Sequence, residues 1–104
     1  STPPVDRRTL AAIAPKLAEL TETVLFGDIW ARASFARERS LITLSALTAQ
    51  GKTEQLPWHI AFGYQNGLSR EEIVELFTHL AFYAGWPAAA SALTCLNAQE
   101  ASCP

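Results

Sequence analysis

The clearest structural signal in the sequence comes from residues 67–72, GLSREE, where one helix is expected to end and the next to begin. Gly67 can adopt the left-handed conformation that commonly terminates a helix. Ser69 and Glu72 have the Ser-x-x-Glu spacing of a capping box, in which each side chain accepts a hydrogen bond from the other residue's backbone N–H. The spacing therefore predicts two helices joined by a very short turn.

Apolar residues recur at helical spacing along most of the chain, and no segment shows the alternation typical of a strand. Leu17, Leu20 and Val24 mark a helix that is expected to start at Pro15, with a bend at Gly27. The other expected helices are capped or begun by Asp6, Ser34, Thr53, Ser69 and Pro87, and their expected stops include Gly51, Gly67 and Gly85. The sequence thus predicts an all-α fold of about six helices in a compact single-domain bundle.

Size and charge restrict the partners that the chain can have. It has 104 residues, of which 49% are hydrophobic, and so small a domain is expected to bury further apolar surface between subunits. The formal net charge is -2 and no basic run is present, so nucleic acid and anionic membranes are poor candidates as partners. Without a membrane-length apolar run or the apolar core of a signal peptide, a cytoplasmic location is expected.

His59 is one of two histidines and falls part way along the helix expected after Thr53. Gln55 and Gly63 lie four residues to either side, so all three share a helix face. A glycine inside a helix costs up to about 1 kcal/mol relative to alanine, which suggests that something comes close to Gly63. The neighbour is either a ligand at a functional site or a packed helix, with His59 then hydrogen-bonded at the interface.

A charged cluster, Arg37, Glu38 and Arg39, opens the helix expected after Ser34. Glu38 shares a face with apolar or small residues such as Ile42, so its carboxylate can face inward, where it needs a histidine or arginine as partner. The alternative is that all three charges are solvated, as is usual in the first turn of a helix. The two arginines gain a function if the ligand is a carboxylate, which a guanidinium group binds well.

The remaining candidates have simpler interpretations. His79 is expected in a hydrogen-bond network with Glu75 and Tyr83, at the surface or at a subunit interface. Trp58 is either a core or interface residue or the wall of a pocket beside His59. Two histidines with no Asp or Cys at ligand spacing predict no metal site.

Four strings occur in order along the chain: LFGDIW at 25–30, RERSLITLSALTAQG at 37–51, LPWHIAFGYQNGLSREEIVEL at 56–76 and THLAFYAGWPAAASAL at 78–93. Together they resemble the carboxymuconolactone decarboxylase family, which is related to the alkyl hydroperoxidase D proteins. The resemblance implies an all-helical subunit in a ring-like homo-oligomer, a trimer or hexamer. It covers residues 15–98, which leaves residues 1–14 as an arm with a short helix and residues 99–104 as a tail.

The peroxidase branch of that family carries the pattern C-x-x-C-x-x-x-H. Lys52 and Gln55 occupy the two cysteine positions counted back from His59, so the dithiol is absent. Cys95 and Cys103 are distant in sequence and are expected to be reduced and structural. A thiol peroxidase is therefore the least favoured function, because no thiolate is expected at this site.

The resemblance implies conversion of 4-carboxymuconolactone to 3-oxoadipate enol-lactone, a step of the protocatechuate pathway of aromatic degradation. The lactone carbonyl, conjugated to the carbon that loses CO2, is the electron sink, so no cofactor is expected. In the family match His59 is the proton donor, and Glu38 orients it and raises its pKa. The residues expected to bind the acidic substrate are Arg37, Arg39, Trp58 and Gln55. The alternative is a non-catalytic oligomeric binding or interaction subunit of the same fold.

Overall fold

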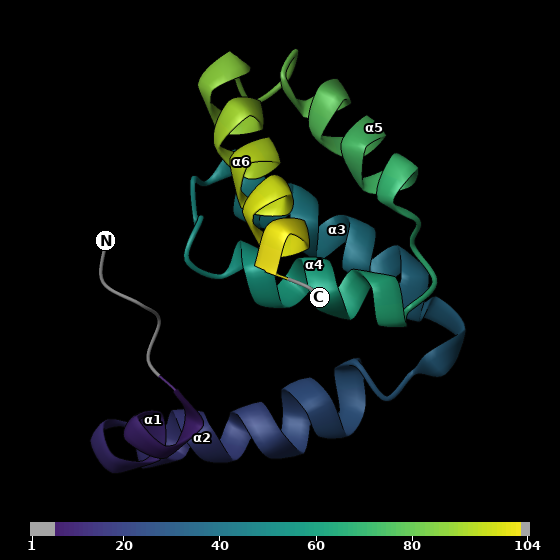
Figure 1. Ribbon diagram of the computed structural model, residues 1–104. Coiled ribbons are helices and arrows are strands. Elements are labelled where there is room, and N and C mark those ends of the chain that lie inside the picture. The colour runs from purple at the N-terminus through teal and green to yellow at the C-terminus, as the bar shows by residue number, and fades with distance from the viewer. Residues whose placement is uncertain (1–5, 103–104) are drawn as a thin grey trace. The chain divides into compact units, whose positions relative to one another are not determined.

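A computed structural model describes residues 6–102, except for the side chains of Ala33 and of residues 100–102 (Figure 1). Each regular element in this range is a helix and six of them are α-helices, which confirms the expected all-α class. The expected arm at residues 1–5 and Cys103 lie outside the described residues. The elements are α1 (Arg7–Ile13), α2 (Pro15–Leu20), the π-helix η1 (Thr21–Ile29), the 3₁₀-helix η2 (Ala33–Phe35), α3 (Ala36–Ala49), α4 (Leu56–Gln65), α5 (Arg70–Leu80) and α6 (Trp86–Ser102).

The chain divides into two units, Ser1–Ala36 and Arg37–Pro104. The expected domain limits at residues 15 and 98 stay a prediction. Within residues 6–102, no helix has both the length and the apolar character that crossing a bilayer requires.

The first unit has no buried core in its described part. Asp6 caps α1 as expected, because its Oδ1 atom accepts a backbone N–H three residues later at 2.7 Å. The side chain of Arg7 links α1 to η1, through an ion pair with Glu22 at 3.1 Å and a position 5.0 Å from the centre of the Phe26 ring. No residue of α1, α2 or η1 is buried. Surface contacts, and not a packed interior, therefore hold this unit together.

The expected bend at Gly27 was wrong, because Gly27 lies inside the π-helix η1. The wide turn is shown by the N–H of Trp30, which donates to the oxygen of Leu25, five residues earlier, at 2.8 Å. An ideal Cβ atom at Gly27 would lie only 2.8 Å from the backbone oxygen of Glu22. A close backbone contact therefore explains the glycine.

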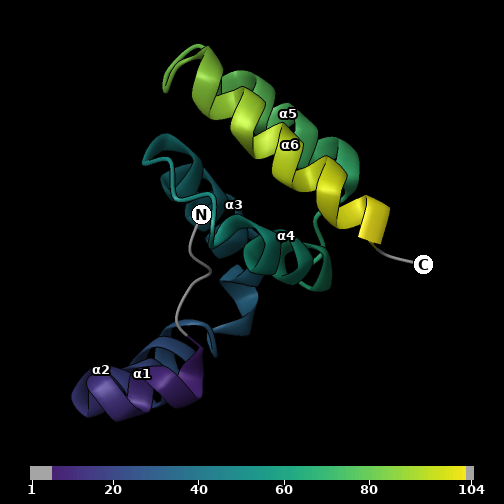
Figure 2. The same cartoon turned by 60° about the vertical axis from the view of Figure 1, so that its left-hand side comes forward.

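The second unit consists of two pairs of helices around one core. α3 and α4 form one pair and α5 and α6 form the other, as Figure 1 and Figure 2 both show. The core cluster has eight buried residues: Leu44, Leu56, Ile60, Leu68, Ile73, Phe77, Ala92 and Leu96. All four helices contribute to it, so this core fixes which faces of α3 and α4 remain available for a site.

The predicted turn between α4 and α5 is confirmed. Gly67 has a φ angle of +97°. The Oγ atom of Ser69 accepts the N–H of Glu72 at 3.1 Å, and Oε1 of Glu72 accepts the N–H of Ser69 at 2.9 Å. The expected stop at Gly51 is confirmed by a φ angle of +71°. The expected stop at Gly85 was wrong, because α5 already ends at Leu80, and the positive φ of Gly85, +102°, belongs to the turn before α6.

Two helices begin later than the sequence predicts. A 3₁₀ turn precedes α3, so this helix begins at Ala36 instead of Ser34. The next helix, α4, begins at Leu56 and is not capped by Thr53. A cap at Thr53 would place Pro57 where the helix needs a backbone N–H donor, which proline lacks, whereas the observed start keeps Pro57 in the first turn.

Candidate functional site

His59 lies on α4 beside an aromatic pair. Its side chain is half-buried, and its backbone N–H donates to the oxygen of Gln55 at 3.4 Å. The ring of Trp58 meets the imidazole edge to face, with centroids 4.9 Å apart, and packs on Phe62 with centroids 4.8 Å apart. Trp58 is 49% exposed, so it forms a wall beside His59 and is not part of the core.

Burial controls the protonation of His59 in the subunit. Loss of solvation lowers the pKa of His59 below its ordinary value of 6.5, because water stabilises the charged imidazolium. His59 is therefore mostly neutral at pH 7. The sequence had predicted the opposite, a pKa raised by Glu38, and the placement of Glu38 explains the difference.

Gly63 on α4 serves the packing of the core. It is buried, and an ideal Cβ atom there would lie 3.2 Å from Cδ1 of Leu68 and 3.6 Å from Cδ1 of Leu44. The missing side chain makes room for these two leucines. Of the two interpretations of Gly63, close packing of the protein itself is the one that the structure confirms.

Glu38 faces out of the second unit. Its side chain is 55% exposed, and its carboxylate lies 3.8 Å from the guanidinium group of Arg37. Ile42, one turn further on the same face, is 67% exposed. The buried face of α3 carries Ser40, Leu44 and Thr48. The expected inward carboxylate was therefore wrong, because α3 is rotated so that other polar residues face the core.

The antiparallel arrangement of α3 and α4 separates Glu38 from His59. Nδ2 of Asn66 donates to Oγ of Ser40 at 3.0 Å, so the end of α4 lies beside the start of α3. His59 precedes Asn66 by seven residues, in the direction that leads away from Glu38. At about 1.5 Å of rise per residue, the two lie roughly 13 Å apart along the helix axes. The structure does not bring them together within one subunit.

The two arginines of the cluster differ in environment. Arg37 forms an ion pair with Oε2 of Glu72, whose other carboxylate oxygen belongs to the capping box of α5. The N–H of Ser69, and after it Arg37, lower the pKa of the Glu72 carboxyl. Arg39 is half-buried on α3. Arg37 thus connects α3 to α5 within the subunit.

His79 belongs to a different surface from His59. It is exposed on α5, and its ring stacks on that of Tyr83 with centroids 4.9 Å apart, so this contact is stacking where a hydrogen bond was expected. Together with Arg37 and Glu75 it lines a cleft of about 420 Å³ between α3 and α5. His79 can therefore serve as the control position when His59 is substituted.

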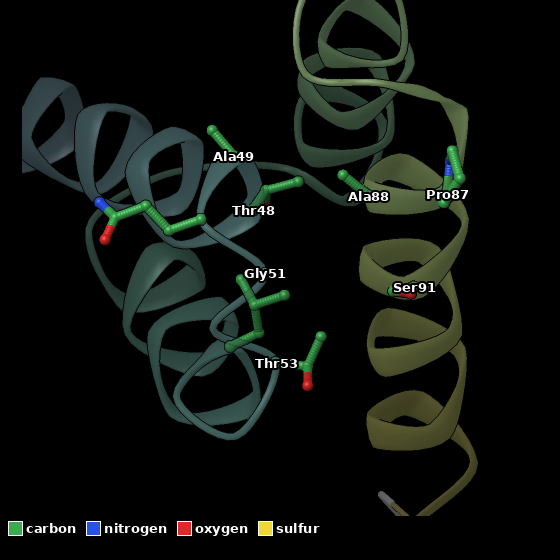
Figure 3. Close-up of a pocket in the computed structure, with 9 residues that line it drawn as sticks. Thr48, Ala49, Gly51, Thr53, Pro87, Ala88 and Ser91 are labelled. Carbon is green, nitrogen blue, oxygen red and sulfur yellow. The ribbon is translucent and has the colours of Figure 1, made fainter.

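Another cleft, of about 480 Å³, lies between the end of α3, residues 50–55 and the start of α6 (Figure 3). Three hydroxyl side chains line it, those of Thr48, Thr53 and Ser91. Sequence reasoning missed this cleft because its walls come from segments that are far apart in the chain. Its only local signal is Thr48, a polar residue on the apolar face of its helix.

Residues 15–98 match the model of the Carboxymuconolactone decarboxylase family. The chain belongs to this family. It is 36% identical over 69 residues to a 4-carboxymuconolactone decarboxylase of Acinetobacter baylyi, which covers 65% of this chain and 52% of that protein. It is 33% identical over 76 residues to a nitrosuccinic acid decarboxylase of Metarhizium robertsii, which covers 72% of this chain and 53% of that protein. The chain spans about half the length of these curated relatives.

The peroxidase pattern of the family is missing at Lys52 and Gln55, but the structure brings a cysteine to the same loop. Sγ of Cys95 lies 3.7 Å from the backbone oxygen of Thr53, although the two residues are 42 positions apart. Burial, with a smaller contribution from Glu54, raises the pKa of the Cys95 thiol. A raised pKa disfavours the thiolate, so Cys95 is a poor nucleophile at neutral pH.

Cys95 is expected to react slowly with an alkylating reagent. In a Cys103→Ser variant at pH 8, iodoacetamide should modify folded protein at least about tenfold more slowly than the same protein unfolded in guanidinium, because burial suppresses the thiolate. Mass spectrometry at timed intervals measures both rates. Faster modification of the folded protein would reveal an activated thiolate and would restore the peroxidase interpretation.

Proposed function

We propose that this chain is a cofactor-free decarboxylase of a small organic acid that carries several carboxylates, most simply 4-carboxymuconolactone or a related acidic lactone. The observation that carries the proposal is the half-buried imidazole of His59, within the matched family region and beside the wall formed by Trp58. The two relatives, both named decarboxylases, support the type of reaction.

Decarboxylation of 4-carboxymuconolactone requires an electron sink and one proton. The bond between carbon and carboxylate breaks, CO2 leaves, and the electron pair moves through the adjacent C=C into the lactone carbonyl, giving a dienolate. A proton then adds to the ring carbon next to the lactone carbonyl, at the end of the dienolate remote from the carbon that lost CO2. In nitrosuccinic acid, the nitro group can accept the electron pair in the same manner. Both reactions need groups that bind carboxylates, stabilise developing charge and deliver a proton.

In this proposal His59 delivers the proton, and Trp58 limits the access of water to the intermediate. Gln55 immediately precedes α4, one turn before His59. In this proposal its side-chain amide hydrogen-bonds the substrate. The neutral imidazole of the resting protein gains its proton when the substrate binds, because nearby carboxylates favour the imidazolium form.

Arg39 binds a substrate carboxylate through its planar guanidinium group. Arg37 is a weaker candidate because Glu72 already holds it. Glu38 can act on His59 only across a subunit interface, since the two are separated within one subunit. Arg39, one residue after Glu38, is separated from His59 in the same way, so in this proposal both residues act on the site of a neighbouring subunit, Arg39 on a substrate carboxylate and Glu38 on His59.

The pH dependence of the rate should follow the titration of His59. Burial lowers the pKa of His59 in the free protein, so kcat/KM, which requires the imidazolium form, should fall as pH rises, with a midpoint below 6.5. The substrate's carboxylates raise this pKa in the complex, so the midpoint in kcat should lie at higher pH. Rates of CO2 release between pH 5 and pH 9 measure both midpoints. A kcat/KM that increases with pH over this range would contradict the role of His59 as proton donor.

Assembly into a homo-oligomer, a trimer or hexamer, is part of the proposal. An aromatic patch at the turn between α5 and α6 supports it, because Phe82, Tyr83 and Trp86 are 73%, 79% and 67% exposed. Apolar surface of this kind commonly marks an interface between proteins. With 4-carboxymuconolactone as substrate, the oligomer acts in the cytoplasm in the degradation of protocatechuate.

Incubation of the full chain with 4-carboxymuconolactone and, in parallel, with nitrosuccinic acid tests the reaction. Saturable release of CO2 from either acid supports decarboxylation. The preferred acid shows whether the site suits a substrate with a lactone carbonyl or one with a nitro group as electron sink. A non-catalytic binding subunit would bind an acid without releasing CO2. If the folded oligomer releases no CO2 from either compound, the proposed reaction is wrong.

A further inference from the structure

Three side-chain rings of α4 form a continuous row, in the order Phe62, Trp58 and His59. The ring of Phe62 packs on the indole of Trp58 with centroids 4.8 Å apart and an angle of 38° between the planes. The indole in turn meets the imidazole of His59 edge to face, with centroids 4.9 Å apart and an angle of 80°. Both distances are typical of attractive contacts between rings. Phe62 is thus connected to His59 through Trp58.

The contact between Trp58 and His59 does not follow from the helix alone. Consecutive residues of an α-helix point in directions about 100° apart, so adjacent side chains do not face each other. The indole therefore reaches the imidazole only in a side-chain conformation that brings it round the helix. A residue four positions later shares a face with Trp58, and its side chain leans toward the N-terminus, onto the preceding turn. Phe62 has this position, so its ring is placed to hold the indole.

The ring of Phe62 lies outside the core of the second unit. The buried residues of α4 are Leu56, Ile60 and Gly63. Tyr64 packs on the core cluster, whereas Phe62, among the residues that the structure describes, is partly buried and does not belong to the group that packs there. Core packing therefore does not account for an aromatic residue at this position, and the contact with Trp58 gives it a role.

Burial, and not a neighbouring charge, controls the protonation of His59. Burial is the cause of its lowered pKa. Residues 40–65 and residues 86–99, which include most of α3 and α6 and all of α4, contain few other ionisable side chains: Lys52, Glu54, Tyr64 and Cys95. The charged side chains of α5 are exposed or paired with α3. A residue that keeps the indole against the imidazole therefore also affects the solvation of the imidazole.

We propose that Phe62 is a positioning residue of the candidate site. Its ring keeps the indole of Trp58 against the imidazole of His59, which fixes the orientation of the imidazole and limits its contact with water. For its effect on the rate this inference rests on the proposed decarboxylation, in which a well-oriented donor transfers its proton faster. The arrangement of the three rings in the free protein does not depend on that reaction.

Two substitutions of Phe62 test the arrangement in the free protein. Phe62→Leu removes the ring and keeps an apolar side chain, whereas Phe62→Tyr keeps the ring. In the full chain labelled with fluorotryptophan, the ¹⁹F signal of Trp58, assigned by its loss in Trp58→Phe, should move toward that of free fluorotryptophan in Phe62→Leu. The pKa of His59, measured by NMR of the imidazole, should rise toward 6.5 because water regains access to the imidazolium. Phe62→Tyr should keep both values close to those of the wild type.

The rate provides a separate measurement. With 4-carboxymuconolactone, Phe62→Leu should lower kcat by about tenfold or more, because a poorly oriented donor reacts slowly. KM should change less, because the contacts proposed for the substrate carboxylates are untouched. If the wild type releases no CO2, the proposed function is wrong, and the two NMR measurements still decide the role of Phe62.

Tyr64→Leu is the matched control, because it replaces a ring with leucine on the same helix. Tyr64 lies two positions after Phe62, on nearly the opposite face of α4, and packs on the core. Its substitution should lower the Tm, measured by circular dichroism, and leave the ¹⁹F signal of Trp58 and the pKa of His59 unchanged.

Three results would overturn the proposal: wild-type values of both NMR measurements in folded Phe62→Leu, loss of both in Phe62→Tyr, or equal changes in Tyr64→Leu. If Phe62→Leu does not fold, nuclear Overhauser effects in the wild type give the answer. Effects from Phe62 to Trp58 and from Trp58 to His59 support the row of rings, and the absence of either contradicts it.

Discussion

Replacing His59 with glutamine is expected to lower kcat for CO2 release by about 10²- to 10⁴-fold, the range that proton transfer from a positioned side chain contributes. Glutamine preserves approximate size and hydrogen bonding, but it cannot supply a proton. KM should change less than kcat, because the proposed carboxylate-binding residue, Arg39, is untouched. Initial rates with 4-carboxymuconolactone, fitted for kcat and KM separately, provide the measurement.

The matched control is His79→Gln, which removes the other histidine. His79 is exposed on α5 and stacks on Tyr83, away from the aromatic pair beside His59. Its loss should change kcat by less than about twofold, as for most surface substitutions, when both variants are compared at protein concentrations where gel filtration shows the oligomer to be assembled. Thermal unfolding of both variants shows whether the fold is intact. A folded His59→Gln variant with the full rate would remove His59 from the mechanism.

Phe77→Ala is expected to have the largest effect on stability. Phe77 is 0% exposed in the core between the two helix pairs. Truncation leaves a cavity there, and a change of this kind costs about 3–5 kcal/mol. The free energy of unfolding of a small domain is only about 5–15 kcal/mol, so much of the stability should be lost. Urea unfolding followed by circular dichroism measures the difference.

Phe82→Ala makes the same chemical change at a position that is 73% exposed. In dilute protein its cost should stay below about 0.5 kcal/mol, as for most surface substitutions. If the aromatic patch lies in a subunit interface, the loss of stability should increase with protein concentration, because assembly stabilises the folded state by mass action. Equal losses for Phe77→Ala and Phe82→Ala in dilute protein would contradict the assignment of Phe77 to the core.

Helix boundaries that depend on neighbouring residues could be predicted from the sequence. The stop at Gly67 and the capping box of Ser69 and Glu72 are local, because all their contacts fall within a few positions. The prediction failed at Thr53, where two local preferences compete. A cap at Thr53 was incompatible with the missing N–H of Pro57, and the restriction imposed by proline prevailed.

The error for Glu38 concerns a second face of α3. Ile42 and Ser45 made the face of Glu38 look apolar or small in the sequence, but the leucines Leu41, Leu44 and Leu47 are the residues that pack on the core. The buried face is decided by partners such as Asn66, which holds Ser40, and by the core around Leu44. These partners belong to other segments, and the helix alone contains no information about them.

Contacts between distant segments limited the prediction of the candidate site in the same manner. His59 could be selected because its residue type and the surrounding string are informative. The approach of Cys95 to Thr53, and the meeting of Thr48 with the start of α6, depend on how the helix pairs pack. Such proximity follows from the tertiary structure, so neither feature could be inferred from spacing.

The two carboxylate oxygens of Glu72 make one local contact, within the cap of α5, and one contact with another helix, α3. One accepts the N–H of Ser69 at 2.9 Å, and the other pairs with Arg37. The first contact can form in an isolated segment and helps α5 to nucleate, whereas the second forms only after α5 has docked on α3. If α5 docked on α3 in the wrong register, Glu72 would keep its hydrogen bond to Ser69 and lose its ion pair with Arg37. The same side chain therefore stabilises an early local step of folding and discriminates among the later ways of docking.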